Sequence, residues 1–548
     1  MLSIFRSATP EVIESLAEEL RVRQTRHFIL LFSMGSQFDH LIVQQLAKLG
    51  IYCLVADPAT VSANDVKKAA PAGIIVSGGP ANVSDARPPF DAEIFDLGIP
   101  TLGICLGFQM WADHIRARVV AGEKREFGVH VLQLVGSDPL FDGVTHVQVL
   151  QSHGDKIETH PNITVLGTTD NAPIAAGRYK HLWGVQFHPE VTETVDGAKM
   201  LENFCVTICG ITDRFPAQNV AAQKIAELKQ TIAGKKVLIA LSGGSDSSVV
   251  AYLLKATMSG ADSQGLTLES PKGQTLKNRA LKGVYIRGID RPDDEAFVRK
   301  YFDGQEWINV EVVDATNRFL NALRGKTDMK EKRLAMRGVY TEVLEEKIKE
   351  FGADFIAQGT LYTDLRESGL GHATGAHIAE IKVHHNTGIN FSVPELRPLE
   401  TEVKDSARSI GREVGVPEDL LIRHPFPGPG LVVRVEGEIT PEKLATARMV
   451  DGIYIEELRK ADLYKDVWQA GATVTRSEHT VSKGDDAGMG HVVALWAVWS
   501  VNGFTARFAQ LPFEFLDKVS RRITNEVHEV GAVVYRISDK PPTTIEWG

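Results

Sequence analysis

The chain has 548 residues, a formal net charge of −10 at pH 7 and a hydrophobic fraction of 43%. A chain of this length exceeds the size at which a single hydrophobic core stops growing, so we expect two or three domains. The negative charge argues against nonspecific nucleic-acid binding, and no apolar run reaches the ~18 residues that a membrane-spanning helix needs. The 4 cysteines are too few for a disulfide framework, which indicates a reducing compartment such as the cytoplasm.

The N-terminal segment does not have the pattern of a secretory signal. Residues 11–23 combine acidic side chains with the apolar spacing of a helix, whereas a signal has a basic start followed by an apolar core. We therefore treat residues 1–26 as an N-terminal extension, which is either a short docking helix or a mobile tail.

Strand and helix patterns alternate after this extension. Strands are expected at 28–32, 52–55, 73–76 and 101–104, with helical segments such as 40–48 between them. This alternation predicts an α/β domain with a parallel sheet, whose active site lies at the carboxyl ends of the strands.

The first candidate catalytic residue lies at such a strand end. Cys105 stands between Gly103 and Gly107 in the sequence GICLGFQ, directly after the apolar strand 101–104. This pattern is typical of a nucleophile elbow, in which a tight turn exposes the reactive side chain. The N-terminus of the following helix, expected at about 109–116, favours the thiolate. The sequence therefore predicts a nucleophilic cysteine.

A thiolate nucleophile needs a base and a site for the oxyanion. A further strand pattern ends in GVQFHPE, which places His188 and Glu190 two residues apart. We predict a Cys-His-Glu triad in which His188 takes and returns the proton and Glu190 orients the imidazole. The oxyanion donors should be backbone N–H groups near Gly79, in the turn SGGP, and near Leu106, in the elbow.

A second candidate site follows the hydrophobic strand 237–241. The sequence SGGSDSS turns straight into a helix, so backbone N–H groups, hydroxyls and the helix N-terminus can all face an anion. Because the loop lacks the lysine of the GxxxxGKS pattern, it is not built to hold a terminal phosphate of ATP through that residue. The alternative is an ordinary turn with Asp246 as a helix cap. The predicted phosphate-binding residues are Ser242, Gly243, Gly244, Ser245, Asp246, Ser247 and Ser248.

The remainder of the chain divides at a proline-rich segment. Strands at 283–286, 308–313 and 354–357 continue a second α/β sheet. Residues 259–282 are rich in Ser, Gly and Lys and are expected to form an inserted surface loop. The Pro and Gly cluster at 425–430 can continue neither a helix nor a central strand, so a third domain should begin there.

These motifs resemble known families. GICLGFQ, SGGP, SHGD and GVQFHPEVT resemble the class I glutamine amidotransferases, and SGGSDSS resembles the loop of the ATP pyrophosphatases. Their combination, with RHPFPGPGL and KPPTTIEW towards the C-terminus, resembles the glutamine-hydrolysing GMP synthases. The resemblance implies two parallel-sheet α/β domains and a smaller α+β domain for dimerisation and nucleotide binding. The expected boundaries are 27–212 for the amidotransferase, 213–424 for the pyrophosphatase and 425–548 for the third domain.

The resemblance also implies a reaction. Glutamine would supply ammonia, ATP would adenylylate XMP with release of pyrophosphate, and ammonia would then give GMP and AMP in a Mg²⁺-dependent homodimer. Asp246 would help to hold the Mg²⁺. Gln109, Ser152 and Asp155 match positions that support the elbow or hold glutamine. Lys404 matches a lysine that offsets the charge of the triphosphate, although a solvated helix face explains it equally well. The expected acceptor-binding residues are Lys540, Ile545 and Glu546.

Several positions depart from the family pattern and leave alternatives open. Ser33 and Met34 replace residues of the usual DFGSQ, Trp496 stands for an Arg, Arg536 and Asn502 stand for acidic residues, and Gly548 replaces a final Glu. The losses could compensate one another, or they could mark a related amidotransferase-ligase that aminates another purine or a specialised metabolite. A noncatalytic regulatory derivative is a more distant alternative, because both catalytic motifs are intact.

Overall fold

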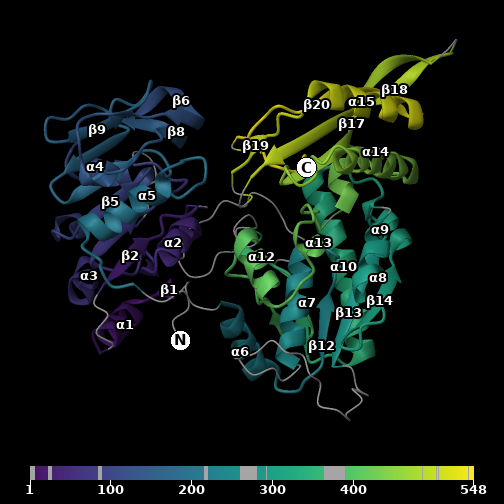
Figure 1. Ribbon diagram of the computed structural model, residues 1–548, viewed down its shortest axis with the longest axis horizontal. Coiled ribbons are helices and arrows are strands. Elements are labelled where there is room, and N and C mark those ends of the chain that lie inside the picture. Colours follow the sequence, from purple (N-terminus) through teal and green to yellow (C-terminus); the bar gives the residue numbers. More distant parts are fainter. Residues whose placement is uncertain are drawn as a thin grey trace. The chain divides into compact units, whose positions relative to one another are not determined.

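The computed structural model describes most of the chain in two compact units. The first unit contains the described residues up to 214, and the second contains the described residues from 220 onwards (Figure 1). The described ranges are 7–22, 27–36, 38–83, 89–214, 220–258, 280–291, 293–362, 364, 389–428, 430–483, 486–500, 503, 505–540 and 542–548. The greater part of the expected insertion at 259–282, the histidines at 384 and 385, and Asn502 lie outside these ranges.

A nine-stranded mixed sheet forms the centre of the first unit. Its strand order is β1-β3-β2-β4-β5-β11-β10-β9-β7, and β1 to β5 and β11 pair in parallel. The strands are β1 (Ser7–Ala8), β2 (Phe28–Phe32), β3 (Tyr52–Ala56), β4 (Gly73–Val76), β5 (Thr101–Ile104), β7 (Gln133–Leu134), β9 (Thr164–Thr168), β10 (Ala176–Tyr179) and β11 (Leu182–Val185).

The sheet is therefore parallel only in part. Strands β10, β9 and β7 add an antiparallel edge. Two residues, Lys180 and His181, connect β10 to β11. A link this short permits a hairpin but not the crossover that parallel pairing requires. A two-stranded antiparallel sheet of β6 (Val119–Val131) and β8 (Gln148–Ile157) completes the strands of this unit.

The helices of the first unit are α1 (Pro10–Val22), α2 (Asp39–Lys48), α3 (Ala63–Ala69), α4 (Leu106–His114) and α5 (Gly197–Glu202), with 3₁₀ turns η1 (Ala92–Asp96) and η2 (Pro139–Phe141) and a π-helix η3 (Asn203–Ile208). Helix α1 contacts α3, and its Ile13, Leu16 and Leu20 are buried in the core of the unit. Of the two interpretations of the N-terminal extension, the structure thus has the docking helix. Helix α4 begins at Leu106, earlier than the predicted 109.

The second unit contains a five-stranded parallel sheet in the order β14-β13-β12-β15-β16. Its strands are β12 (Val237–Ala240), β13 (Leu281–Arg287), β14 (Asn309–Asp314), β15 (Phe355–Ala357) and β16 (Glu395–Leu396). The accompanying helices are α6 (Val220–Ile232), α7 (Ser245–Met258), α8 (Asp294–Phe302), α9 (Thr316–Leu323), α10 (Met329–Phe351), α12 (Lys404–Glu413) and α13 (Glu418–Leu421). Val237, Leu238 and Ile239 are buried, which explains why β12 is recognisable in the sequence as an apolar run.

The C-terminal part of this unit is an α+β arrangement. It contains the 3₁₀ turn η4 (Gly430–Arg434), helices α14 (Pro441–Lys460) and α15 (Phe513–Glu526), and strands β17 (Gln469–Lys483), β18 (Asp486–Trp499), β19 (Arg507–Phe508) and β20 (Val530–Tyr535). Strand β18 pairs antiparallel with β17 and β19 and parallel with β20.

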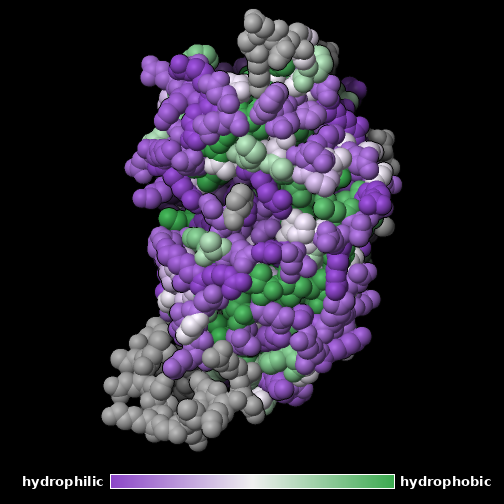
Figure 2. All heavy atoms as spheres, turned by 90° about the vertical axis from the view of Figure 1, so that its right-hand side faces the viewer, coloured by the Kyte–Doolittle hydropathy of each residue, from purple (hydrophilic) through white to green (hydrophobic). Residues whose placement is uncertain are grey.

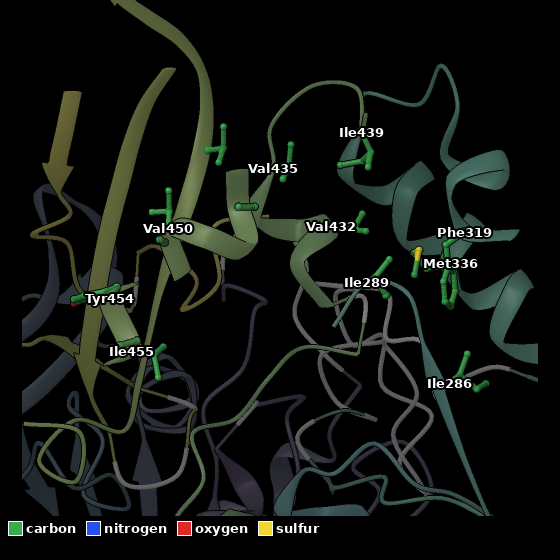
Figure 3. Close-up of a cluster of buried hydrophobic side chains, with 14 of the residues drawn as sticks. Ile286, Ile289, Phe319, Met336, Val432, Val435, Ile439, Val450, Tyr454 and Ile455 are labelled. Atoms are coloured by element: carbon green, nitrogen blue, oxygen red, sulfur yellow. The ribbon is translucent and has the colours of Figure 1, made fainter. Parts of the chain in front are cut away.

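One hydrophobic cluster runs through both parts of the second unit. It includes Phe319 of α9, Met336 of α10, Val432 of η4 and Tyr454 of α14, which Figure 3 shows in close-up. A core that is shared in this way fixes the C-terminal sheet against the parallel sheet, so residues of both parts can line one cavity. Hydrophilic residues cover most of the face shown in Figure 2, with hydrophobic areas between them. Within the described residues, no helix is long and apolar enough to cross a membrane.

Candidate active sites

Cys105 occupies a strained turn between β5 and α4. Its φ of 51° lies in the left-handed region, which is uncommon for a residue with a side chain. The flanking glycines allow the turn to close. A Cβ on Gly103 would lie 2.6 Å from backbone atoms of Gly107, and a Cβ on Gly107 would lie 2.1 Å from the carbonyl oxygen of Val76. The turn therefore has the tight, glycine-dependent geometry of a nucleophile elbow.

His188 and Glu190 lie beside this elbow because β11 is the parallel neighbour of β5. Glu190 Oε1 is 2.7 Å from His188 Nδ1, both side chains are buried, and His188 shares a hydrogen bond with the Cys105 side chain. Burial lowers the pKa of His188, but Glu190 and Cys105 outweigh that effect and raise it to about 10. The structure thus brings the three predicted residues together, with His188 between the thiol and the carboxylate.

Two buried glutamines support the nucleophile. Gln186 Nε2 donates to Cys105 Sγ at 3.6 Å, and Gln109 Nε2 donates both to Gln186 Oε1 and to the carbonyl oxygen of Asp155, each at 3.2 Å. Cys105 Sγ also lies 4.0 Å from the carbonyl oxygen of Ser152. Sequence reasoning selected Gln109, Ser152 and Asp155 but missed Gln186, although a polar residue at the end of a buried strand was a usable signal.

The predicted oxyanion donors lie next to the nucleophile. A Cβ on Gly78 would be 3.5 Å from Cys105 Cβ, and a Cβ on Gly79 would be 3.1 Å from a side-chain carbon of Leu106. The Gly107 N–H is used within the fold, since it donates to the Ser77 carbonyl oxygen at 3.2 Å. Leu106 is the first residue of α4, where an N–H has no partner within the helix. The glycine turn and the elbow therefore adjoin, as the oxyanion prediction requires.

A buried acid-imidazole pair lies beside Asp155 of β8. His153 Nε2 is 3.1 Å from Glu126 Oε2, and His153 Nδ1 is 2.8 Å from the Asp155 carbonyl oxygen. Glu126 is fully buried and also accepts from Thr169 Oγ1 at 2.9 Å. Burial raises the pKa of Glu126, but the hydrogen bonds of His153 and Thr169 lower it below its ordinary value. The pair fixes the carbonyl group that holds Gln109, and no sequence pattern pointed to Glu126.

The second unit contains a pocket of about 290 Å³ that brings together the two remaining groups of predicted residues. From the phosphate loop it is lined by Ser242, Gly244, Ser245, Asp246 and Ser247, and from the other predictions by Lys404, Lys540, Ile545 and Glu546. The volume is near the lower end of the range for small-molecule sites. A single cavity therefore joins the loop at the end of β12 to the C-terminal tail.

Two residues of the phosphate loop do not line the pocket. Ser248 is fully buried and its hydroxyl donates to the Gly244 carbonyl oxygen at 2.8 Å. Gly243 has a φ of 71°, and a Cβ there would lie 2.5 Å from a methyl group of Val298. Its carbonyl oxygen accepts from Arg423 Nη1 at 2.8 Å. Ser248 and Gly243 thus shape the loop from behind.

Lys404 is bonded to Asp246. Its Nζ lies 2.7 Å from each carboxylate oxygen of Asp246, and it is only 4% exposed. This burial rules out a solvated helix face as the explanation of Lys404. Among the described residues no group of three or more His, Cys, Asp or Glu side chains could hold a metal ion. Asp246 with Asp364 in the pocket wall still suits Mg²⁺, which takes one or two carboxylates together with substrate phosphates.

The C-terminal residues of the pocket are held by a buried charge network. Arg434 is fully buried; it donates to Asp451 Oδ1 at 2.7 Å and to the two carboxylate oxygens of Glu546 at 2.7 and 3.1 Å. Gln469 Nε2 donates to Glu546 Oε1 at 2.6 Å. The predicted acceptor residue Glu546 is thus at the pocket wall, but its carboxylate is already bonded by Arg434 and Gln469. Sequence reasoning missed Arg434, whose position inside the apolar run LVVRV was a usable signal for a buried, paired charge.

The C-terminal tail makes two further contacts in the pocket through backbone carbonyl groups. Lys540 Nζ donates to the Gly503 carbonyl oxygen at 2.9 Å, and the Gly548 carbonyl oxygen accepts from Arg333, which also lines the pocket. Lys540 therefore lines the same cavity as the phosphate loop, and Gly548 contacts Arg333, a cation of the pocket wall.

Comparison with known proteins matches this architecture over nearly the whole chain. Residues 30–208 match the class-I glutamine amidotransferase model, and residues 456–547 match the model of the GMP synthase C terminal domain. A glutamine-hydrolyzing GMP synthase of Lactococcus lactis is 38% identical over 95% of this chain and 98% of its own length. One of Clostridium botulinum is 39% identical over 95% of this chain and 99% of its own length. The chain belongs to the glutamine-hydrolysing GMP synthase family.

Among solved structures, a putative GMP synthase subunit of Thermoplasma acidophilum is 26% identical with a TM-score of 0.30, covering 34% of this chain and 94% of that one. A glutamine amidotransferase of Thermotoga maritima is 20% identical with a TM-score of 0.28, covering 34% of this chain and 94% of that one. Membership of the GMP synthase family confirms the predicted combination of an amidotransferase domain of class I with a GMP synthase C-terminal domain.

Proposed function

We propose that this protein makes GMP from XMP, using ATP and the ammonia that it releases from glutamine. The observation that carries this proposal is the pocket of the second unit, in which the phosphate loop and the C-terminal tail of a GMP synthase family member line one cavity. A phosphate-binding loop beside an acceptor-binding tail is what adenylyl transfer needs, since the two reactants must meet in one geometry.

The ammonia-forming site in this proposal is the elbow of the first unit. Cys105 attacks the side-chain carbonyl carbon of glutamine, and His188 passes a proton to the leaving ammonia. The oxygen of the tetrahedral intermediate would be stabilised by the N–H groups of Gly79 and Leu106. Water then cleaves the thioester to give glutamate and the free thiol. Glu190 keeps the imidazole of His188 oriented through both steps.

The ligase reaction takes place in the second unit. The oxygen on C2 of XMP attacks the α-phosphorus of ATP, and pyrophosphate leaves. Ammonia then attacks C2, and AMP leaves to give GMP. The N–H groups and hydroxyls of the loop residues that line the pocket, Ser242 and Gly244 to Ser247, would hold the phosphates, with Lys404 offsetting their charge. Asp246 would hold Mg²⁺, which would further neutralise the charge of the phosphates.

The acceptor nucleotide would lie against the C-terminal wall. Lys540 is proposed to bind its phosphate, and Ile545 and Glu546 to contact the nucleotide. We further propose that the C-terminal part of the second unit forms a homodimer, and that the protein acts in the cytoplasm. The cytoplasmic location is supported by the 4 cysteines, all of which are free thiols.

The test is a product assay with purified protein, ATP, Mg²⁺, XMP and either glutamine or ammonium chloride. We expect GMP, AMP and pyrophosphate in equal amounts, and glutamate only when glutamine is supplied. ADP and inorganic phosphate in place of AMP and pyrophosphate would contradict the adenylylation. Turnover of IMP or another purine nucleotide in preference to XMP would favour the related ligase, a candidate suggested by the altered pair Trp496 and Arg536. Light scattering tests the dimer.

A further inference from the structure

Two arginines share one buried tryptophan in the C-terminal sheet. Trp496 of β18 is 0% exposed, and its ring centre lies 5.1 Å from the guanidinium carbon of Arg434 and 5.3 Å from that of Arg536. Gly471, opposite Trp496 on β17, leaves the space for this packing, because a Cβ there would be 2.7 Å from both Arg434 and Trp496. These distances are within the range of cation–π contacts.

Both arginines hold the same short segment of the chain. Arg434 binds the carboxylate of Glu546, whereas Arg536 donates to the backbone carbonyl oxygens of Thr544 at 3.3 Å and Ile545 at 2.9 Å. Ile545 and Glu546 line the pocket. The position of this wall of the pocket therefore depends on Arg434, which binds a side chain, and on Arg536, which binds backbone carbonyl groups.

Trp496 allows both arginines to bind this segment while they lie close to each other. Two guanidinium groups repel each other, and a third cation at position 496 would add to that repulsion. An aromatic face instead attracts both cations. Trp496 thus gives the cation at 536 an uncharged aromatic ring as its neighbour.

We propose that Arg536 and Trp496 are positioning residues that set the acceptor-binding wall of this pocket by fixing residues 544–546. The proposal rests on the proposed function, because it assigns the pocket wall to the purine nucleotide that is aminated. Arg536 and Trp496 act through the C-terminal segment and need not touch the nucleotide themselves.

The first test is the variant Arg536→Gln, assayed with ammonium chloride so that the glutaminase is bypassed. Loss of a charged donor to two carbonyl groups should raise the KM for XMP by roughly ten- to a hundredfold, with little change in kcat. The KM for ATP should stay within about twofold of the wild type, because the phosphate loop is untouched. The matched control is Arg521→Gln, which removes an exposed arginine of α15 that pairs with Asp517. It should change neither constant.

The second test exchanges the pair. Trp496→Arg alone brings a third guanidinium group to Arg434 and Arg536 and should raise the KM for XMP at least as much as Arg536→Gln. The double variant Trp496→Arg with Arg536→Asp places opposite charges side by side. It relieves the repulsion but has no donor for the carbonyl groups of Thr544 and Ile545, so its KM for XMP should stay as high as that of Arg536→Gln, and a return to the wild-type value would overturn the positioning role of Arg536. Thermal unfolding of each variant shows whether it folds. If the Trp496 variants do not fold, Arg536→Gln alone decides whether Arg536 has the positioning role.

The results separate the inference from the proposed function. Wild-type protein that does not convert XMP would refute the proposed acceptor, and the preferred acceptor found in the nucleotide panel would then replace XMP in the same measurements. An Arg536→Gln variant with unchanged acceptor KM in an active enzyme would overturn the positioning role. An equal rise in the KM values for ATP and acceptor would do the same, since it would indicate a general loss of structure.

Discussion

The two sites of this protein are built in opposite ways. In the first unit, Cys105 comes directly after β5 and His188 three residues after the end of β11; these strands are parallel neighbours whose register places Ile104 beside Val185. In the second unit, the pocket wall proposed to bind the acceptor, here called the acceptor wall, joins Arg434 of η4, Asp451 of α14 and Glu546 of the C-terminal tail. The first site therefore depends on local turns at the ends of one sheet. The second depends on charge pairing between residues that lie far apart in the chain.

The largest effect should separate the two sites by chemistry. Cys105→Ala removes the nucleophile, so glutamine-dependent GMP synthesis should fall by at least about a thousandfold. Synthesis from ammonium chloride should remain close to the wild-type rate, because the ligase pocket is unchanged. Both rates are measured as GMP formed per enzyme. The control is Cys53→Ala, another buried cysteine of the first unit, which should keep both activities. Glutamine-driven turnover by Cys105→Ala would disprove the role of the thiol.

The next effect tests the charge network of the acceptor wall. Arg434→Met removes the cation and leaves the carboxylates of Asp451 and Glu546 buried without it, so the free energy of unfolding should fall by about 3–5 kcal/mol. Urea denaturation, followed through the transition of the second unit, measures the loss. Arg521→Gln serves as the exposed control and should change the free energy by less than about 0.5 kcal/mol. Equal stability of the two variants would mean that the network contributes no more than a surface pair.

Cys105 and Arg434 differ in how well their roles could be predicted from the sequence. The strands 28–32, 73–76 and 101–104 have their predicted bounds because buried parallel strands are apolar runs bounded by turn residues. The triad residues lie in short strings whose chemistry is local. The apolar run LVVRV indicates that Arg434 is buried, but its partners Asp451 and Glu546 lie far away along the chain and could not be identified from the sequence. The antiparallel edge β10-β9-β7 was missed for a related reason, since pairing direction depends on which strands meet.

A third variant acts on the phosphate loop. Lys404→Ala leaves Asp246 without its 2.7 Å partner and removes a cation from the pocket, so GMP synthesis should fall about a hundredfold with either nitrogen donor. The matched control is Lys224→Ala, which removes a similarly buried lysine that pairs with Glu402 and does not line the pocket. A loss restricted to the glutamine-dependent rate would contradict the assignment of Lys404 to the ligase site.

A smaller effect concerns the pH dependence of the first unit. The pKa of His188 is raised from an ordinary 6.5 to about 10, so its protonation stabilises the folded state fully below pH 6.5. That contribution is lost as the pH rises through 10. The difference in free energy of unfolding between wild type and His188→Gln should therefore shrink across this window, by more than about 1.4 kcal/mol, the equivalent of one pKa unit. Repeating the pair in a Glu190→Gln background should flatten the dependence, because the carboxylate that raises the pKa is gone.

The smallest expected effect concerns a buried amide side chain near the first site. Gln151 of β8 is fully buried beside Ser152, and neither atom of its amide has a hydrogen-bond partner among the described residues. Gln151→Met keeps the shape and removes the unpaired polar group, so the first unit should gain about 1 kcal/mol, or roughly 2–4 °C in its unfolding temperature. Gln148→Met, on the same strand, loses a bond of 3.1 Å to the Glu193 carbonyl oxygen and should give no gain. Equal responses would mean that Gln151 is satisfied by bound water.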